Sequence, residues 1–103
     1  MQELSIVLTT SAGEDQAQPI IDALLEQRLA ACVQALPVRS HYIWEGAVRH
    51  DIETLLIIKC KSENYKAIEE TILQLHSYDL PEIVRIPIAD GLDRYLDWIA
   101  SPG

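Results

Sequence analysis

Two cysteines and three histidines are the residues of this 103-residue chain best suited to bind a transition metal. They are Cys32, Cys60, His41, His50 and His76. Thiolate and imidazole together suit copper or zinc. No C-x-x-C or H-x-x-x-H spacing is present, so the sequence does not predict a closed structural zinc site. Both cysteines lie in apolar segments and are expected to be reduced, buried thiols.

Carboxylates are the next residues that could take part in chemistry. Five of them are candidates for acid–base work: Glu45, Asp51, Glu53, Asp79 and Glu82. Their spacing indicates no catalytic pair, and the chain has no Ser/His/Asp order, phosphate-binding glycine loop or nucleophile elbow. We therefore expect a protein that is not an enzyme.

The charge balance restricts the possible partners. The chain has 8 basic and 16 acidic residues and a formal net charge of -8, which repels nucleic acid and anionic membranes but permits metal cations. No segment approaches the roughly 20 apolar residues of a membrane span. The N-terminus shows no signal-peptide pattern, so we predict a cytoplasmic protein. The length predicts one domain over residues 1–103.

The first half of the chain predicts a strand, a helix and a second strand. Residues 4–10 are apolar and β-branched, typical of a buried strand. Apolar residues then recur at three- and four-residue spacing over about residues 15–29, which indicates a helix. Either Asp15 and Gln18 form a capping box, or the helix begins just before Pro19. Residues 31–36 form the second strand, and Pro37 is expected to break it or make a bulge.

A long hairpin follows Pro37. Ser40, Tyr42 and Trp44 alternate with His41 and Ile43, Gly46 supplies the turn, and residues 48–61 form the return strand. His41 and His50 flank the tip and are expected to face solvent. Both arms exceed the usual strand length of about 5–6 residues, so we expect the hairpin to project beyond its own subunit.

The last third of the chain completes an α+β pattern. Ser62 is expected to cap a second helix, residues 76–81 form a loop, residues 82–88 form a fourth strand and residues 92–99 a short helix. The order βαββαβ plus a helix is that of a ferredoxin-like fold. Right-handed crossovers place both longer helices on one face of the sheet. The uncovered face then needs a partner.

Four segments in this order resemble the CutA family of divalent-cation tolerance proteins: residues 29–33 (LAACV), 42–46 (YIWEG), 75–83 (LHSYDLPEI) and 95–99 (YLDWI). The resemblance implies a homotrimer with its sheets inside and its helices outside. It also implies a role in tolerance of divalent metal ions, chiefly copper, with Cys32 and His76 as metal ligands.

The sequence departs from the family at positions that concern the metal. In members best known for copper binding, a cysteine stands at the position of Thr9 and a histidine at that of Leu75. Ala47 and Ser77 replace a usual lysine and proline. The copper site is therefore expected to be weak and short of ligands.

The aromatic residues are expected at subunit boundaries. Tyr42 and Trp44 on the hairpin suit a subunit interface. Tyr78, Glu82 and Trp98 are candidates for the cleft between subunits that CutA proteins share with PII signalling proteins. An alternative function is thus a PII-like module that holds a small molecule in this cleft, with Cys32 and His76 also near it.

Overall fold

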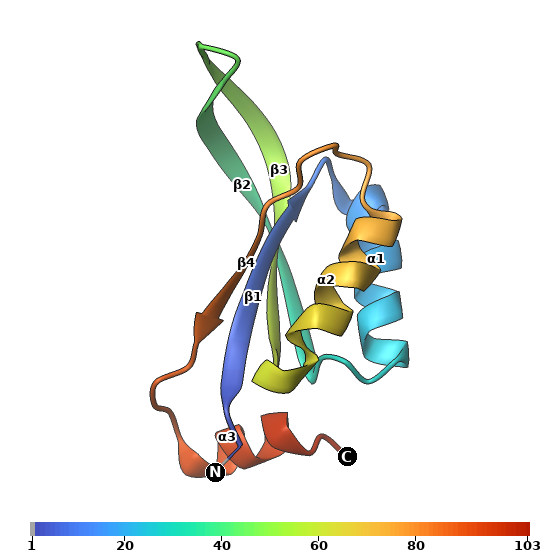
Figure 1. Cartoon of the computed structure of the whole chain (residues 1–103), viewed down its shortest axis with the longest axis vertical. Coiled ribbons are helices and arrows are strands. Elements are labelled where there is room, and N and C mark those ends of the chain that lie inside the picture. Colours follow the sequence, from blue (N-terminus) through green and yellow to red (C-terminus); the bar gives the residue numbers. More distant parts are fainter. Residues whose placement is uncertain (1) are drawn as a thin grey trace.

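The fold is a four-stranded antiparallel sheet with helices packed against it (Figure 1). The structure is a computed structural model that describes residues 2–103. Its elements are β1 (Leu4–Ser11), α1 (Glu14–Glu26), β2 (Cys32–Trp44), β3 (Ala47–Lys61), the 3-10 turn η1 (Ser62–Asn64), α2 (Tyr65–Leu75), β4 (Ile83–Pro87) and α3 (Asp93–Ala100). The strand order is β2-β3-β1-β4. The α+β order predicted from periodicity is confirmed.

The core lies between the sheet and the two longer helices, α1 and α2. Val7 of β1 pairs with Ile58 of β3, and both side chains are fully buried. The apolar stripes that predicted the helices supply the opposite layer, including Ile20 of α1 and Ile72 of α2. Burying each such side chain contributes about 1.5–3 kcal/mol. This layer fixes which face of every strand points away from the helices.

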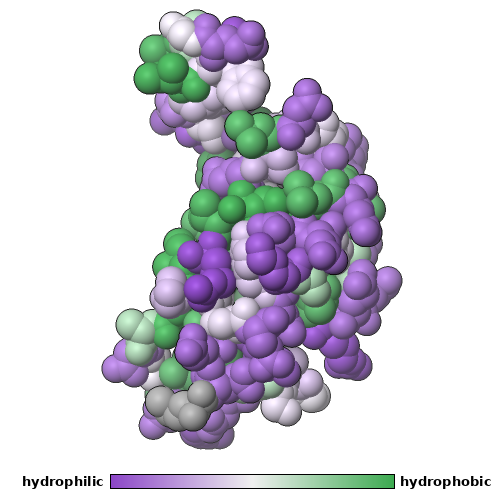
Figure 2. Space-filling model, viewed as in Figure 1, coloured by the Kyte–Doolittle hydropathy of each residue, from purple (hydrophilic) through white to green (hydrophobic). Residues whose placement is uncertain are grey.

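The opposite face of the sheet, here called the open face, carries a second set of apolar residues. Register and alternation place on it Ile6, Leu8, Leu36, Leu55, Ile57, Val84 and Ile86. Leu36, Val84 and Ile86 are each at least 40% exposed. Figure 2 shows hydrophobic residues along the side of the sheet away from the helices. The exposed Ile43 and Val48 beside the hairpin turn lie on the other side of the ladder. No helix covers the middle of the open face in the described chain (Figure 1).

The β2–β3 hairpin extends beyond the helical layer (Figure 1), in a chain measuring 44 × 26 × 22 Å. Glu45 and Gly46 form its turn, with φ values of 50° and 76°. Positive φ at both central residues is the type I′ geometry that matches strand twist. The predicted hairpin and its turn are confirmed. Cys32 to Trp44 pair without interruption, so the predicted break or bulge at Pro37 is wrong. Proline is tolerated there because β2 is an edge strand.

Two predicted helix starts are also wrong. Helix α1 begins at Glu14, with Pro19 inside it and no side-chain cap, so neither the Asp15–Gln18 capping box nor a start at Pro19 occurs. Instead, the Gly13 carbonyl accepts hydrogen bonds from the backbone N–H groups of Gln16 and Ala17. Ser62 does not cap α2, because its hydroxyl lies 2.6 Å from that of Ser5. A tertiary partner has displaced the local cap in this case.

The described helices are all too short or too polar to cross a bilayer.

Candidate functional site

His76 anchors a loop over the end of the open face nearest the hairpin. Its Nε2 lies 2.6 Å from the Thr10 carbonyl oxygen, and its Nδ1 accepts a hydrogen bond from the Tyr78 N–H at 3.1 Å. A carbonyl can only accept, so Nε2 carries the proton and the neutral tautomer is fixed. Both ring nitrogens are thus engaged within the chain. A metal ion at His76 would have to displace one of these bonds.

Tyr78 connects this loop to a buried carboxylate on β3. Its ring packs on His76 with centroids 4.7 Å apart, and its hydroxyl donates to Glu53 Oε2 at 2.9 Å. Glu53 is only 8% exposed. Burial, followed by the hydrogen bond to Glu53, raises the pKa of Tyr78 to about 12. Tyr78 therefore stays protonated and serves as a donor, not as a base, at neutral pH.

A second tyrosine–carboxylate pair lies farther along the hairpin on the same face. The Tyr42 hydroxyl donates to Asp51 Oδ2, and this bond is the main reason that the pKa of Tyr42 is raised. Trp44 follows two residues later, and both aromatic rings are about 40% exposed. Tyr42 and Trp44 share one side of the hairpin, as the alternation predicted, and the register places that side on the open face.

Cys32 lies at the opposite end of the open face, near α3. It pairs with Lys59 of β3 and is free and half-buried, so the expectation that it is buried is wrong for the single chain. Lys59 Nζ donates to the Tyr95 hydroxyl at 3.0 Å, which raises the pKa of Lys59. Tyr95 stacks on Trp98, with ring centroids 5.7 Å apart. Trp98 thus belongs to the same end of the face as Cys32.

The predicted metal ligands do not converge within one chain. Cys32 pairs with Lys59, whereas His76 contacts Thr10, which pairs with Leu55. The four-residue offset along β3 corresponds to about 13 Å. Residues 2–103 contain no group of three or more metal-binding side chains. A site using both residues would therefore require more than one copy of the chain.

The predicted cleft residues are also divided between the two ends. Glu82 precedes Ile83, which pairs with Thr9 near the hairpin end, and its side chain is exposed. Tyr78 lies at that same end, while Trp98 lies at the α3 end. The open face thus has an apolar middle with a polar and aromatic group at each end.

Cys60 faces the helices and is 1% exposed, as predicted. Its thiol lies 3.6 Å from the Ser5 carbonyl oxygen. Burial raises the pKa of Cys60 to about 11, so the thiol stays neutral and is a poor ligand or nucleophile. The two cysteines lie on opposite faces of the sheet and are both free.

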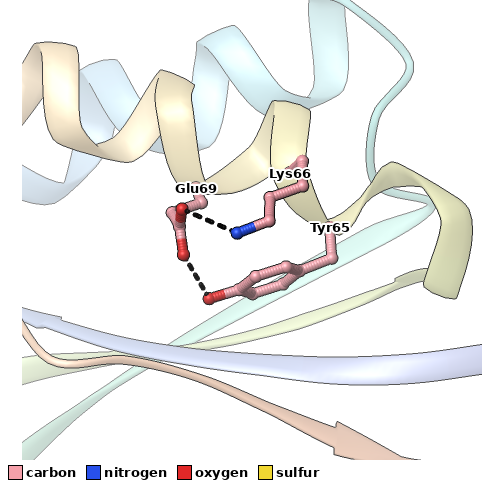
Figure 3. Close-up of polar contacts among 3 residues, drawn as sticks. All are labelled: Tyr65, Lys66 and Glu69. Carbon is pink, nitrogen blue, oxygen red and sulfur yellow. Dashed lines mark hydrogen bonds and ion pairs between the residues drawn. The ribbon is translucent and has the colours of Figure 1, made fainter.

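Another polar cluster lies at the start of α2 (Figure 3). Glu69 accepts a hydrogen bond from the Tyr65 hydroxyl at 2.7 Å and forms an ion pair with Lys66 at 3.6 Å. The Tyr65 bond is the main cause of a lowered pKa for Glu69. A shallow cavity of about 520 Å³ nearby is lined by Gln2, Glu3, Ser62, Glu63, Tyr65, Lys66 and Arg85. Two acids balance two bases, so the lining favours neither anions nor cations.

Sequence reasoning missed two contacts that shape the open face. These are the bond from Tyr78 to Glu53 and the bond from Lys59 to Tyr95. One signal was available, because alternation places Glu53 on the same face as Leu55 and Ile57. A carboxylate in such a row needs a partner. The partner itself comes from a loop 25 residues away, which periodicity does not predict.

Comparisons with known proteins agree with this fold. The profile of the family described as CutA1 divalent ion tolerance protein matches residues 5–102. The divalent-cation tolerance protein CutA of Thermus thermophilus is 44% identical over 95 residues, covering 91% of this chain and 92% of that protein. The structure of the CutA of Archaeoglobus fulgidus, described as periplasmic, superposes with a TM-score of 0.89 at 36% identity, covering 93% and 94% of the two chains. For CutA1 from Oryza sativa the TM-score is 0.90 at 32% identity, covering 99% and 97%. This chain therefore belongs to the CutA1 family of divalent ion tolerance proteins.

Proposed function

We propose that the protein acts in tolerance of divalent metal ions, chiefly copper, as a non-enzymatic cytoplasmic homotrimer. The observation that carries the proposal is the similarity, over more than nine-tenths of the chain, to proteins named for divalent-cation tolerance. The role is exercised either by binding the ion or by an indirect route.

The open face supports the assembly. Its middle carries a cluster of apolar side chains, with Gln34 opposite Ile57 as a polar residue among them, and soluble monomers rarely expose large apolar clusters. Tyr42 and Trp44 extend this surface along the hairpin, and aromatic residues are enriched in interfaces. Further copies of the same chain would cover both. Each copy would then also bring its α3 end and its hairpin end within reach of a neighbour.

Cys32 supports a metal ion at such a boundary. It is the only sulfur ligand on the open face among the described residues, and thiolate is the softest ligand in the chain. Thr9 is buried in the core, and Leu75, at the end of α2, has no donor atom. Neither residue supplies a further ligand. The site would need water or a group from a neighbouring copy, and weak binding is expected.

Calorimetry with Cu(I) on the reduced protein tests the assignment. We expect Cys32→Ser to reduce binding strongly and the matched change Cys60→Ser to leave it unchanged, because Cys60 is buried on the other face. His76→Ala should have an intermediate effect. Tight binding that survives both Cys32→Ser and His76→Ala would show that the metal site is elsewhere.

The two ends of the open face also support the alternative, a PII-like module. A cleft between copies would combine Tyr78 and Glu82 of one chain with Cys32 and Trp98 of the next. Tyr78, held protonated, and the exposed Trp98 ring suit an organic ligand with both polar and aromatic parts. A thermal-shift screen of small molecules tests this, because a ligand specific for the folded protein raises the melting temperature. Stabilisation that is abolished by Trp98→Ala, without copper binding, would favour this alternative.

A further inference from the structure

His41 and His50 form a cross-strand pair on the hairpin. They are directly opposite in the register of β2 and β3. Their ring centroids are 6.0 Å apart and the ring planes are within 8° of parallel. Both side chains are exposed. Two imidazoles are thus presented to solvent side by side from a continuous two-stranded ladder.

The backbone positions of this pair suit a two-histidine metal chelate, although the rings, 6.0 Å apart, must tilt to form one. Opposed residues of an antiparallel pair have Cβ atoms about 4.5–5.5 Å apart. Two metal–nitrogen bonds of about 2.1 Å require ring nitrogens no more than about 4 Å apart. The second side-chain torsion of histidine is soft, so exposed rings can tilt from parallel toward a shared ion. The strands hold the Cα positions in place before the metal arrives.

The neighbours on this face determine the kind of ion. The flanking pairs are Ile43 with Val48 and Arg39 with Ile52, none of which is a ligand. Tyr42 and Asp51 belong to the opposite side of the ladder by alternation. Water must therefore complete the coordination, which selects ions that favour imidazole, in the order copper above nickel and zinc. The net charge of -8 favours cation approach in general.

We propose that the His41–His50 pair is a surface site for one divalent transition-metal ion per chain, bound by the two imidazoles and water. The site is independent of Cys32 and of the proposed function, because it lies on the hairpin and on the opposite side of the ladder from Tyr42. Each imidazole would donate the lone pair of one ring nitrogen to the ion.

Calorimetric titration of the reduced full-length protein with Ni²⁺ tests the proposal, since Ni²⁺ avoids reduction by the thiols. His41→Ala and His50→Ala should each lower the affinity by at least the roughly 10- to 100-fold that loss of even a second-shell partner costs. The double variant should bind Ni²⁺ about as weakly as either single variant, because the loss of one imidazole already removes the chelate.

Matched controls separate this site from the others. Arg39→Ala, a change on the same face, and Cys32→Ser should retain wild-type Ni²⁺ affinity. Melting temperatures of the histidine variants should match that of the wild type, since both side chains are exposed. Ni²⁺ affinity unchanged in both His41→Ala and His50→Ala would overturn the proposal. Loss in only one of them would also overturn it, since it would indicate a single histidine and not a chelate.

Discussion

The Thr9 hydroxyl is a buried polar group with an unusual environment. Thr9 of β1 is fully buried between the sheet and the helices, and its Oγ1 has no hydrogen-bond partner among residues 2–103. Such a group keeps the cost of leaving water without gaining a protein bond. Sequence alone gave no indication of this, because threonine is common in strands and its partner depends on the packing of distant helices.

Thr9→Val should therefore stabilise the protein. Valine keeps the shape and removes the unpaired hydroxyl, so the free energy of unfolding should rise by about 1 kcal/mol. Urea unfolding at one fixed protein concentration measures the change. The control is Thr71→Val, because the Thr71 hydroxyl donates to the Ala67 carbonyl at 2.8 Å. If both variants gained equally, the missing bond at Thr9 would not be the cause.

The burial of Tyr78, followed by its bond to Glu53, makes stability sensitive to alkaline pH. The pKa of Tyr78 is raised from 10.0 to about 12, so the folded state holds this proton more tightly than the unfolded chain does. The resulting stabilisation is complete below pH 10 and is lost as the pH rises through about 12. The sequence pointed to Tyr78 only through resemblance, whereas the structure supplies its partner.

Glu53→Gln should lower the pKa of Tyr78 without restoring the ordinary value. Burial is the larger cause of the shift, and the carboxylate is the second, so only part of the shift should disappear. NMR titration of tyrosine labelled at Cζ measures it, with Tyr78→Phe to assign the signal. Glu82→Gln, which changes an exposed carboxylate, should leave the titration unchanged. A larger shift in Glu82→Gln than in Glu53→Gln would contradict the assigned partner.

At the scale of elements, the sequence predicted the hairpin better than the helix starts. The turn at Gly46 and the alternation along both arms follow from local chemistry, because a two-residue turn fixes the register of the whole ladder. Ser62, by contrast, bonds Ser5 across 57 positions. Pro37 was predicted to interrupt β2 because proline cannot donate to a strand ladder. It does not, because β2 is an edge strand, and a strand's place in the sheet is a property of the assembled fold. Tertiary context decided both cases.

The turn itself yields opposite predictions at adjacent positions. Gly46→Ala places a side chain at φ 76° and should cost roughly 1–2 kcal/mol. Glu45→Asn should be neutral or stabilising, since asparagine tolerates positive φ and Asn-Gly is the preferred type I′ pair. Urea unfolding of both variants at equal protein concentration tests this. Destabilisation by Glu45→Asn matching that of Gly46→Ala would argue against the type I′ turn.

For the whole molecule, the distribution of apolar surface matters more than its amount. The chain has 103 residues and 49% hydrophobic composition, yet its two longer helices cover one face of the sheet, and α3 reaches only one end of the other (Figure 1). Each copy carries a net charge of -8, so electrostatic repulsion opposes association and the attraction must come from apolar burial. Salt should accordingly strengthen assembly, because it screens the repulsion. Sequence periodicity predicted the uncovered face but not the polar groups at its two ends.

A charge in the middle of the open face should prevent assembly. Ile57 lies there between Leu8 and Gln34, and Ile57→Lys would bury an ammonium group without a partner, at a cost of several kcal/mol. Light scattering should give three times the 11.6 kDa chain mass for the wild type and a single-chain mass for the variant. The control is Leu73→Lys, because Leu73 of α2 is already 53% exposed and lies in the helical layer. That variant should remain a trimer. A wild-type mass of one chain, or dissociation by Leu73→Lys but not by Ile57→Lys, would show that the open face is not the surface through which copies associate.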